Sequence, residues 1–152
     1  STRSLTLFPY TTLFRSGASL RKFAKLIEAL VREEGVNEKM SEFINPLAAL
    51  ADQMTKFTTE IGFKAFVNPD EVGGASVDYL RVAGHLVFGY FFARMASVAL
   101  KKIAEGNTDP FYTAKLQTAR FYFARLFPET ASLMRTARSG VANLLDTDAA
   151  LA

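Results

Sequence analysis

Cysteine and tryptophan are absent from this chain of 152 residues, and it contains a single histidine. The absence of cysteine excludes disulfides, thiolate metal sites and cysteine nucleophiles, and it is typical of a reducing compartment such as the cytoplasm. A single histidine also leaves a multi-histidine metal centre or a serine–histidine triad hard to build. The chain therefore has few of the residues on which metal-dependent or nucleophilic catalysis depends.

Apolar residues, in contrast, are abundant. Hydrophobic residues make up 49% of the chain and charged residues 22%, which is the composition of a soluble globular domain. One domain is expected at this length, and it would bury roughly 70% of the surface of the unfolded chain. No internal repeat or low-complexity segment divides the sequence.

The first 16 residues differ from the rest. Residues 6–16 read TLFPYTTLFRS, which resembles the in-frame translation of a common sequencing-library adapter. We therefore expect residues 1–16 to be a non-native, disordered segment. The alternative is a short β-prone strand with a turn at Pro9. If the adapter interpretation holds, a larger protein could precede Gly17.

The net charge gives no support for nucleic-acid binding. The formal charge of the chain is +3, but the N-terminal segment contains two of the 18 basic residues, Arg3 and Arg15, and none of the 15 acidic ones. Without that segment the charge falls to +1. A chain so close to neutrality offers no basic face, so we expect no nucleic-acid partner.

Beyond the segment, apolar residues recur every three or four positions, which predicts amphipathic helices. The first helix is expected at residues 19–34 and ends before Gly35. The second helix has either a lead-in turn or a kink at Pro46. Its predicted core stripe consists of Met40, Phe43, Leu47, Leu50, Met54, Phe57 and Ile61.

The third predicted helix is the most apolar. Asn68-Pro69 ends the second helix, and residues 72–74 are expected to form a flexible connection. The helix that follows, at residues 76–105, is hydrophobic almost all round, which is typical of a central bundle helix or a membrane helix. Because His85 and Arg94 interrupt its apolar run, we expect no membrane span.

The fourth helix is expected to begin at Asp109-Pro110, an N-cap followed by proline. Pro128 predicts a kink at residues 124–127, after which the helix resumes toward Gly140. Its predicted core stripe consists of Tyr112, Leu116, Ala119, Phe123, Leu126, Thr130 and Leu133. Short connections between four such helices predict an all-α fold, an up-down-up-down four-helix bundle.

No motif specifies a catalytic, cofactor-binding or metal site. His85 is expected to be a satisfied core residue, because no second ligand or nucleophile is placed to help it. Residues 73–74 lack the remainder of a phosphate-binding loop. Acids and cations are candidates by residue type alone, and on helix surfaces such residues are mostly solvated or weakly paired. These candidates are Glu33, Glu34, Glu60, Arg94, Lys115 and Arg120.

Two blocks of sequence carry a resemblance to a known family. Residues 78–85 read DYLRVAGH and are followed by GY and ARMA at 89–90 and 93–96. Residues 111–123 read FYTAKLQTARFYF and continue to LFPE at 126–129. Together the blocks are similar to the C-terminal extension of the acyl-CoA dehydrogenase family, in the subgroup that includes methylmercaptopropionyl-CoA dehydrogenases and related long-chain enzymes.

The resemblance implies a C-terminal helical domain at residues 17–145, after the artefactual segment 1–16 and before a tail at 146–152. It also implies a parent enzyme that uses FAD to remove the α and β hydrogens of an acyl-CoA thioester. In that family a glutamate is the base and flavin N5 accepts the hydride. These groups precede the extension, so the resemblance implies a fragment without its own active site. The alternative is a free-standing helical interaction or ligand-binding module.

The last helix also has aromatic residues outside its core stripe. Phe111, Phe121 and Tyr122 fall at angles that a four-helix bundle leaves exposed, and such a patch is typical of an interface. We expect it to dock onto the catalytic domains of the parent chain or onto a second subunit of a homo-oligomer, unless the kink at Pro128 or residues 40–44 cover it.

Overall fold

The computed structural model of the chain describes residues 8–145, and side chains over residues 18–144. Residues 1–7 and the predicted tail at 146–152 lie outside the described residues. Within this range the chain is helical, which confirms the predicted all-α class. The elements are α1 (Phe8–Glu34), η1 (Glu38–Met40), α2 (Ser41–Val67), α3 (Asp70–Ala104), α4 (Pro110–Phe121), η2 (Tyr122–Leu126), α5 (Glu129–Ala137) and α6 (Ala142–Leu145).

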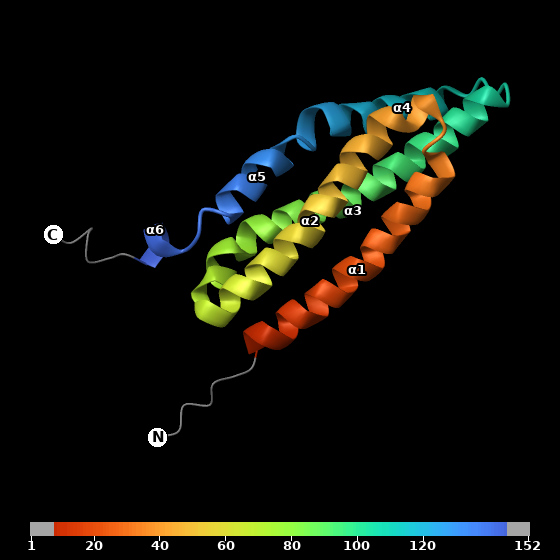
Figure 1. Cartoon of the computed structure of the whole chain (residues 1–152). Helices are drawn as coiled ribbons and strands as arrows, with labels where there is room; N and C mark the ends of the chain where they lie inside the picture. Colours follow the sequence, from red (N-terminus) through yellow and green to blue (C-terminus); the bar gives the residue numbers. More distant parts are fainter. Residues whose placement is uncertain (1–7, 146–152) are drawn as a thin grey trace.

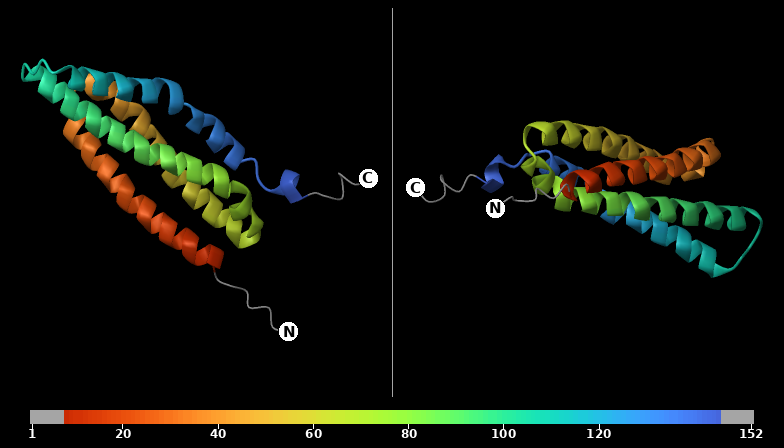
Figure 2. Two further views of the ribbon diagram at one scale, coloured as in Figure 1. Left: turned by 180° about the vertical axis from the view of Figure 1, so that it is seen from behind. Right: turned by 90° about the horizontal axis from the view of Figure 1, so that it is seen from below.

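α1, α2 and α3 run along one long axis in alternating directions, and α4, η2 and α5 together follow this axis back (Figure 1). The central pair is α2 and α3, and α1 packs against both of them. The run formed by α4, η2 and α5 packs against α3 and makes up the fourth pass of the chain. In the two further views α1 and the α4–α5 run lie on opposite sides of this central pair (Figure 2).

The first helix starts earlier than predicted. It begins at Phe8, so residues 8–16 extend the helix that was expected from residue 19. Pro9 is its second residue, a position in the first turn where the missing N–H costs no helical hydrogen bond. Gly17 is tolerated inside a helix at a cost of about 1 kcal/mol.

The core stripe predicted for α2 is confirmed, because all seven of its residues are buried. The helix is preceded by the short 3-10 turn η1, in which the side chain of Asn37 accepts a hydrogen bond from the backbone N–H of Lys39. Pro46 lies inside α2. The predicted lead-in turn before Pro46 is therefore wrong: the helix begins at Ser41, its N-cap is Met40, and Pro46 lies within its second turn.

The flexible connection predicted at residues 72–74 is wrong, because α3 already begins at Asp70. The side chain of Asn68 accepts a hydrogen bond from the backbone N–H of Asp70 at 3.1 Å. The carboxylates of Asp70 and Glu71 in the first turn also favour the positive end of the helix dipole. The segment around Val141 packs closely on α3 at Gly74, since a Cβ at Gly74 would lie 3.4 Å from Cβ of Val141.

Among the described residues, α3 is the one helix long and apolar enough to cross a membrane by length and composition, a test that core helices of soluble proteins also pass. It packs against α1, α2, α4 and α5. Nevertheless, only 33% of its most apolar 18-residue window is buried. The outer face of α3 comprises Val77, Leu80, Gly84, Val87, Phe88, Phe91 and Val98, of which Gly84 is part-buried and the other six are exposed.

The fourth pass begins as predicted. The side chain of Asp109 caps α4 by accepting a hydrogen bond from the backbone N–H of Phe111 at 2.9 Å, and Pro110 is the first helical residue. The helix is then interrupted before Pro128, also as predicted. The interruption is the π-helical turn η2, closed by a hydrogen bond from the N–H of Phe127 to the carbonyl oxygen of Tyr122 at 2.9 Å.

The π turn corrects the predicted core stripe. It contains one residue more than an α-helical turn, so within the turn the face that points inward advances by one position, from Leu126 to Phe127. Leu126, predicted to lie in the core, is 47% exposed, whereas Tyr122 and Phe127 are buried. Downstream of the turn Thr130 and Leu133 are buried as predicted.

Candidate functional site

Four side chains from three separate elements form a polar cluster on one side of α3. Arg81 and His85 come from α3, Tyr122 from η2 and Glu129 from the start of α5. Nδ1 of His85 lies 2.9 Å from the hydroxyl of Tyr122, and Nε2 lies 3.1 Å from a carboxylate oxygen of Glu129. Arg81 donates to the other oxygen of the same carboxylate. We call these four residues the His85 cluster.

The partners of His85 determine its tautomer. The carboxylate of Glu129 can only accept, so Nε2 carries the proton and donates to it. The hydroxyl of Tyr122 lies 2.9 Å from Nδ1 and donates to the carbonyl oxygen of His85 at 3.2 Å. Both ring nitrogens therefore have partners, which confirms the prediction that His85 is a satisfied residue.

Tyr122 is held as a neutral phenol. Its side chain is 4% exposed, and its ring stacks on that of Phe92 with 4.3 Å between the centroids. Burial raises the pKa of Tyr122 from 10.0 to about 12. At neutral pH the hydroxyl can donate a hydrogen bond but cannot act as a base. The His85 cluster thus ties η2 and α5 to α3, and the buried side chain of Tyr122 presents almost no surface to a substrate.

The acids that were candidates by residue type are each held by another side chain of the chain. Glu33 pairs with Arg94 at 3.4 Å. Glu34 accepts a hydrogen bond from the hydroxyl of Ser97. Glu60 forms ion pairs, both at 3.3 Å, and its partners are Lys64 and Arg138. The three acids therefore serve contacts within α2 and between helices, and the structure does not bring them together.

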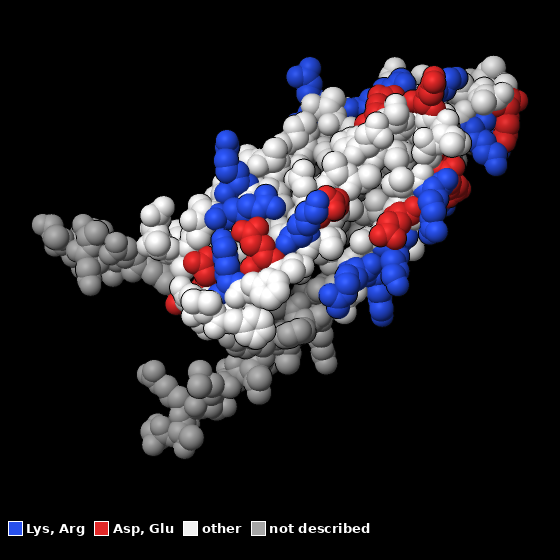
Figure 3. Space-filling model, in the orientation of Figure 1, with Lys and Arg blue, Asp and Glu red and all other residues white. Residues whose placement is uncertain are grey.

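The candidate cations are also engaged within the chain. Arg94 is bound to Glu33, and Arg120 pairs with Glu42 of α2 at 2.9 Å. The ammonium group of Lys115 lies 5.1 Å from the centre of the Phe111 ring. On the face seen in Figure 3, basic and acidic side chains alternate, so this face has no single-sign patch for phosphate or nucleic acid.

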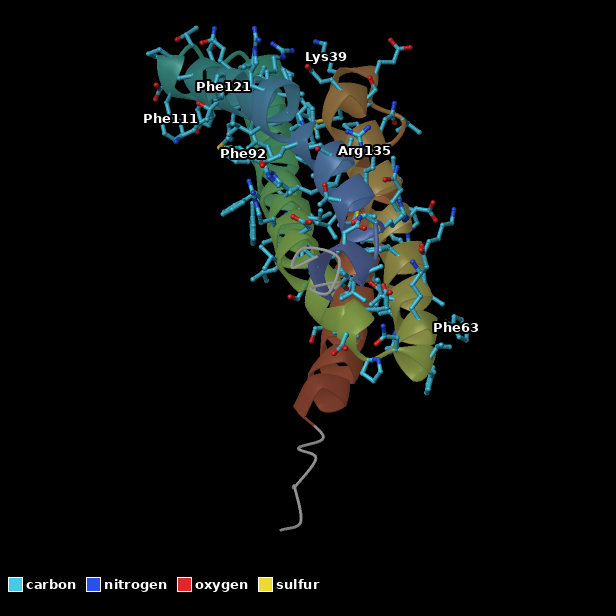
Figure 4. The ribbon with its side chains drawn as sticks, turned by 90° about the vertical axis from the view of Figure 1, so that its left-hand side faces the viewer. Lys39, Phe63, Phe92, Phe111, Phe121 and Arg135 are labelled. Atoms are coloured by element: carbon cyan, nitrogen blue, oxygen red, sulfur yellow. The ribbon has the colours of Figure 1, made fainter. Side chains whose placement is uncertain are left out.

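The aromatic patch predicted on the last helix is present only in part. Phe111 and Phe121 are 54% and 58% exposed. Figure 4 shows them at the same edge of the molecule as Phe92. Tyr122, however, is buried, so its predicted exposure is wrong. The physical reason is its packing on α3, where its ring stacks on Phe92 and its hydroxyl meets His85. No residue pattern marks the π turn that begins at Tyr122, although Pro128 signals that the helix cannot continue regularly.

Comparison with known proteins agrees with this all-helical architecture. The family described as "Acetyl-CoA dehydrogenase C-terminal like" matches residues 20–148, which is most of the chain. The match begins within α1 and extends past α6. No curated protein sequence matches the chain. The chain therefore belongs to the acetyl-CoA dehydrogenase C-terminal-like family.

Proposed function

We propose that this domain is the C-terminal helical part of an FAD-dependent acyl-CoA dehydrogenase from the subgroup of methylmercaptopropionyl-CoA and long-chain enzymes, acting in the cytoplasm. The parent enzyme catalyses α,β-dehydrogenation of an acyl-CoA thioester. The observation that carries this proposal is the family match over residues 20–148. Residues 1–16 are a translated adapter in this proposal, and the catalytic domains precede Gly17 in the natural protein.

Within this parent enzyme the domain is structural and does not bind FAD. The described residues do not fit the cofactor. The glycine pair at residues 73–74 lies inside α3, where it forms no loop around a phosphate. The candidate acids Glu33, Glu34 and Glu60 are each bound to side chains of this chain. The glutamate base and the flavin contacts accordingly belong to the catalytic domains.

The domain packs against these catalytic domains or a second subunit through Phe111 and Phe121. Both side chains belong to α4 and are more than half exposed. An aromatic side chain removes 150–250 Å² from water when it is covered. Two such side chains on one edge of the molecule therefore supply the apolar anchors on which interfaces depend.

The reading frame of the source DNA tests the proposed parent. Upstream of Gly17 it should continue into a sequence that encodes flavin-binding domains. A promoter and start codon directly at this point would contradict the proposal. The purified chain should also retain no FAD after gel filtration and should not reduce a dye acceptor with any acyl-CoA. A yellow preparation would place the cofactor site in this domain.

Association with the encoded catalytic domains tests the docking surface. The chain should bind them, and the double variant Phe111→Ser with Phe121→Ser should bind at least about tenfold more weakly, as expected for truncated aromatic anchors. Val36→Ser is the matched control, because Val36 is 93% exposed in the connection between α1 and α2. Equal binding by the double variant and the control would refute the role of the two phenylalanines.

A further inference from the structure

The outer face of α3 has a pattern that the packing of this chain does not use. Val77, Gly84, Phe91 and Val98 are spaced by seven residues, and Leu80 and Val87 by seven as well. The second series ends at Arg94. A seven-residue repeat of apolar residues is the pattern of a helix that packs along one other helix. α3 contacts α1, α2, α4 and α5. Apart from the edge of Phe88, which meets the ring of Tyr122, these neighbours leave the large side chains of the repeat 38–72% exposed.

Gly84 interrupts this exposed face without any reason inside the monomer. A Cβ placed there would meet nothing within 4 Å. A glycine in the middle of a helix costs about 1 kcal/mol relative to alanine. In contrast, a Cβ at Gly89, on the buried side of α3, would lie 2.9 Å from the ring of Phe127. The missing side chain at Gly84 thus leaves a notch that allows something outside the chain to approach the backbone closely.

The large side chains of the face complement this notch. Phe91 is 60% exposed and lies two turns after Gly84 on the same side of α3. If two copies of α3 cross antiparallel about a two-fold axis between Val87 and Phe88, Phe91 of one copy lies over Gly84 of the other. The same symmetry places Val77 opposite Val98, so the whole face is covered. A two-fold interface requires such self-complementarity, because both copies contribute the same surface.

Charge at the edges of the face favours the same occupant. Arg81 and Arg94 flank it, and they form ion pairs with Glu129 and Glu33 respectively. Two copies therefore meet without unpaired like charge on these flanks. The paired cations are also unsuited to attract an anionic lipid surface, which binds helices through free Lys and Arg beside the apolar face.

The size of the face is sufficient for a weak dimer. Six large side chains with exposures of 38–72% make it up. They present on the order of 600 Å², the upper end for the largest apolar patch of a monomer and most of the roughly 800 Å² that each partner buries in a standard interface. We propose that the outer face of α3 is a self-association surface, on which a second copy of this chain packs its own α3 antiparallel.

Sedimentation velocity of the full chain, from micromolar to millimolar concentration, tests the proposal. The wild type should show a monomer–dimer equilibrium. Phe91→Asp should weaken dimerisation by roughly thirtyfold or more, the loss typical of a central aromatic anchor. Phe63→Asp is the matched control, since Phe63 is 69% exposed but lies on α2, outside both proposed surfaces. Gly84→Leu should also weaken the dimer while the helical circular dichroism stays unchanged, because the notch is filled and the monomer has room.

Cross-linking tests the antiparallel register. The chain has no cysteine, so a Gly84→Cys chain mixed with a Phe91→Cys chain should form a disulfide-linked heterodimer in preference to either homodimer. Val36→Cys, in the connection between α1 and α2 and outside the outer face of α3, should give no linked dimer. A wild type that stays monomeric throughout, one that stays monomeric and binds phosphatidylcholine vesicles, or a dimer that Phe91→Asp leaves intact would each overturn the proposal.

Discussion

Two glycines of α3, five residues apart, should respond oppositely to the same substitution. At Gly84 a Cβ meets nothing within 4 Å, whereas at Gly89 it would lie 2.9 Å from Cε2 of Phe127 and 3.1 Å from Cδ1 of Leu47. Alanine raises helix stability by about 0.5–1 kcal/mol at either position. Gly84→Ala should therefore raise the free energy of unfolding by that amount.

At Gly89 the same gain is opposed by crowding. Phe127 and Leu47 are buried and cannot move into solvent. Overpacking of a core usually costs about 1–3 kcal/mol, so Gly89→Ala should lower the free energy of unfolding by up to about 2 kcal/mol. The two variants should then differ by roughly 1–3 kcal/mol, or several degrees in the midpoint of thermal unfolding.

Urea denaturation followed by helical circular dichroism measures this difference, at a dilution where the chain is monomeric. The combination of Gly89→Ala with Phe127→Leu should recover part of the loss, because the smaller side chain makes room for the new methyl group. If Gly89→Ala is as stable as Gly84→Ala, then Phe127 and Leu47 do not close on the helix at this point and the packing argument is refuted.

Two further predictions concern the His85 cluster and the N-terminal segment. Tyr122→Phe should lower the free energy of unfolding by roughly 1–3 kcal/mol, since Nδ1 of His85 loses its partner. Because the folded chain keeps the phenol proton of Tyr122 up to a pKa of about 12, stability should fall as pH rises from 10 toward 12, where only the unfolded chain releases this proton. Burial also raises the pKa of Tyr79, so an ultraviolet titration should show these two tyrosines ionising late, and the Tyr122→Phe variant should lose the later of the two steps. Deletion of residues 1–16 should leave the unfolding midpoint unchanged, and a drop of several degrees would show that the first turns of α1 pack on the domain.

The sequence predicted α2 best and the fourth pass least well. All seven members of the α2 stripe are buried because the spacing is regular from Met40 to Ile61. On the fourth pass the same reasoning failed at Tyr122 and Leu126, although Thr130 and Leu133 are buried as predicted. A π turn shifts the inward face by one residue, and periodicity detects only the average repeat, so Phe127 is buried in place of Leu126.

The His85 cluster could not be predicted from local patterns. Tyr122 and Glu129 lie 37 and 44 residues from His85 along the chain. Their meeting depends on how α5 turns after Pro128, which no sequence period encodes. The same holds for the start of α3, where capping by Asn68 and the acids of the first turn outweigh the glycines at 73–74.

Two ion pairs join α2 to the fourth pass, one on each side of its π turn and proline. Glu42 bonds to Arg120 near one end and Glu60 to Arg138 near the other, and both pairs join residues 78 positions apart. Glu42 and Glu60 are 18 positions apart on α2, a helical rise of about 27 Å. Arg120 and Arg138 are also 18 positions apart, although a π turn and Pro128 lie between them. Such half-exposed pairs contribute little stability, but together they define the register of the fourth pass along α2. An insertion or deletion of one residue between the two pairs would keep one pair in register and displace the other. Insertions and deletions should therefore be tolerated in the connections between helices and not within this part of the fourth pass.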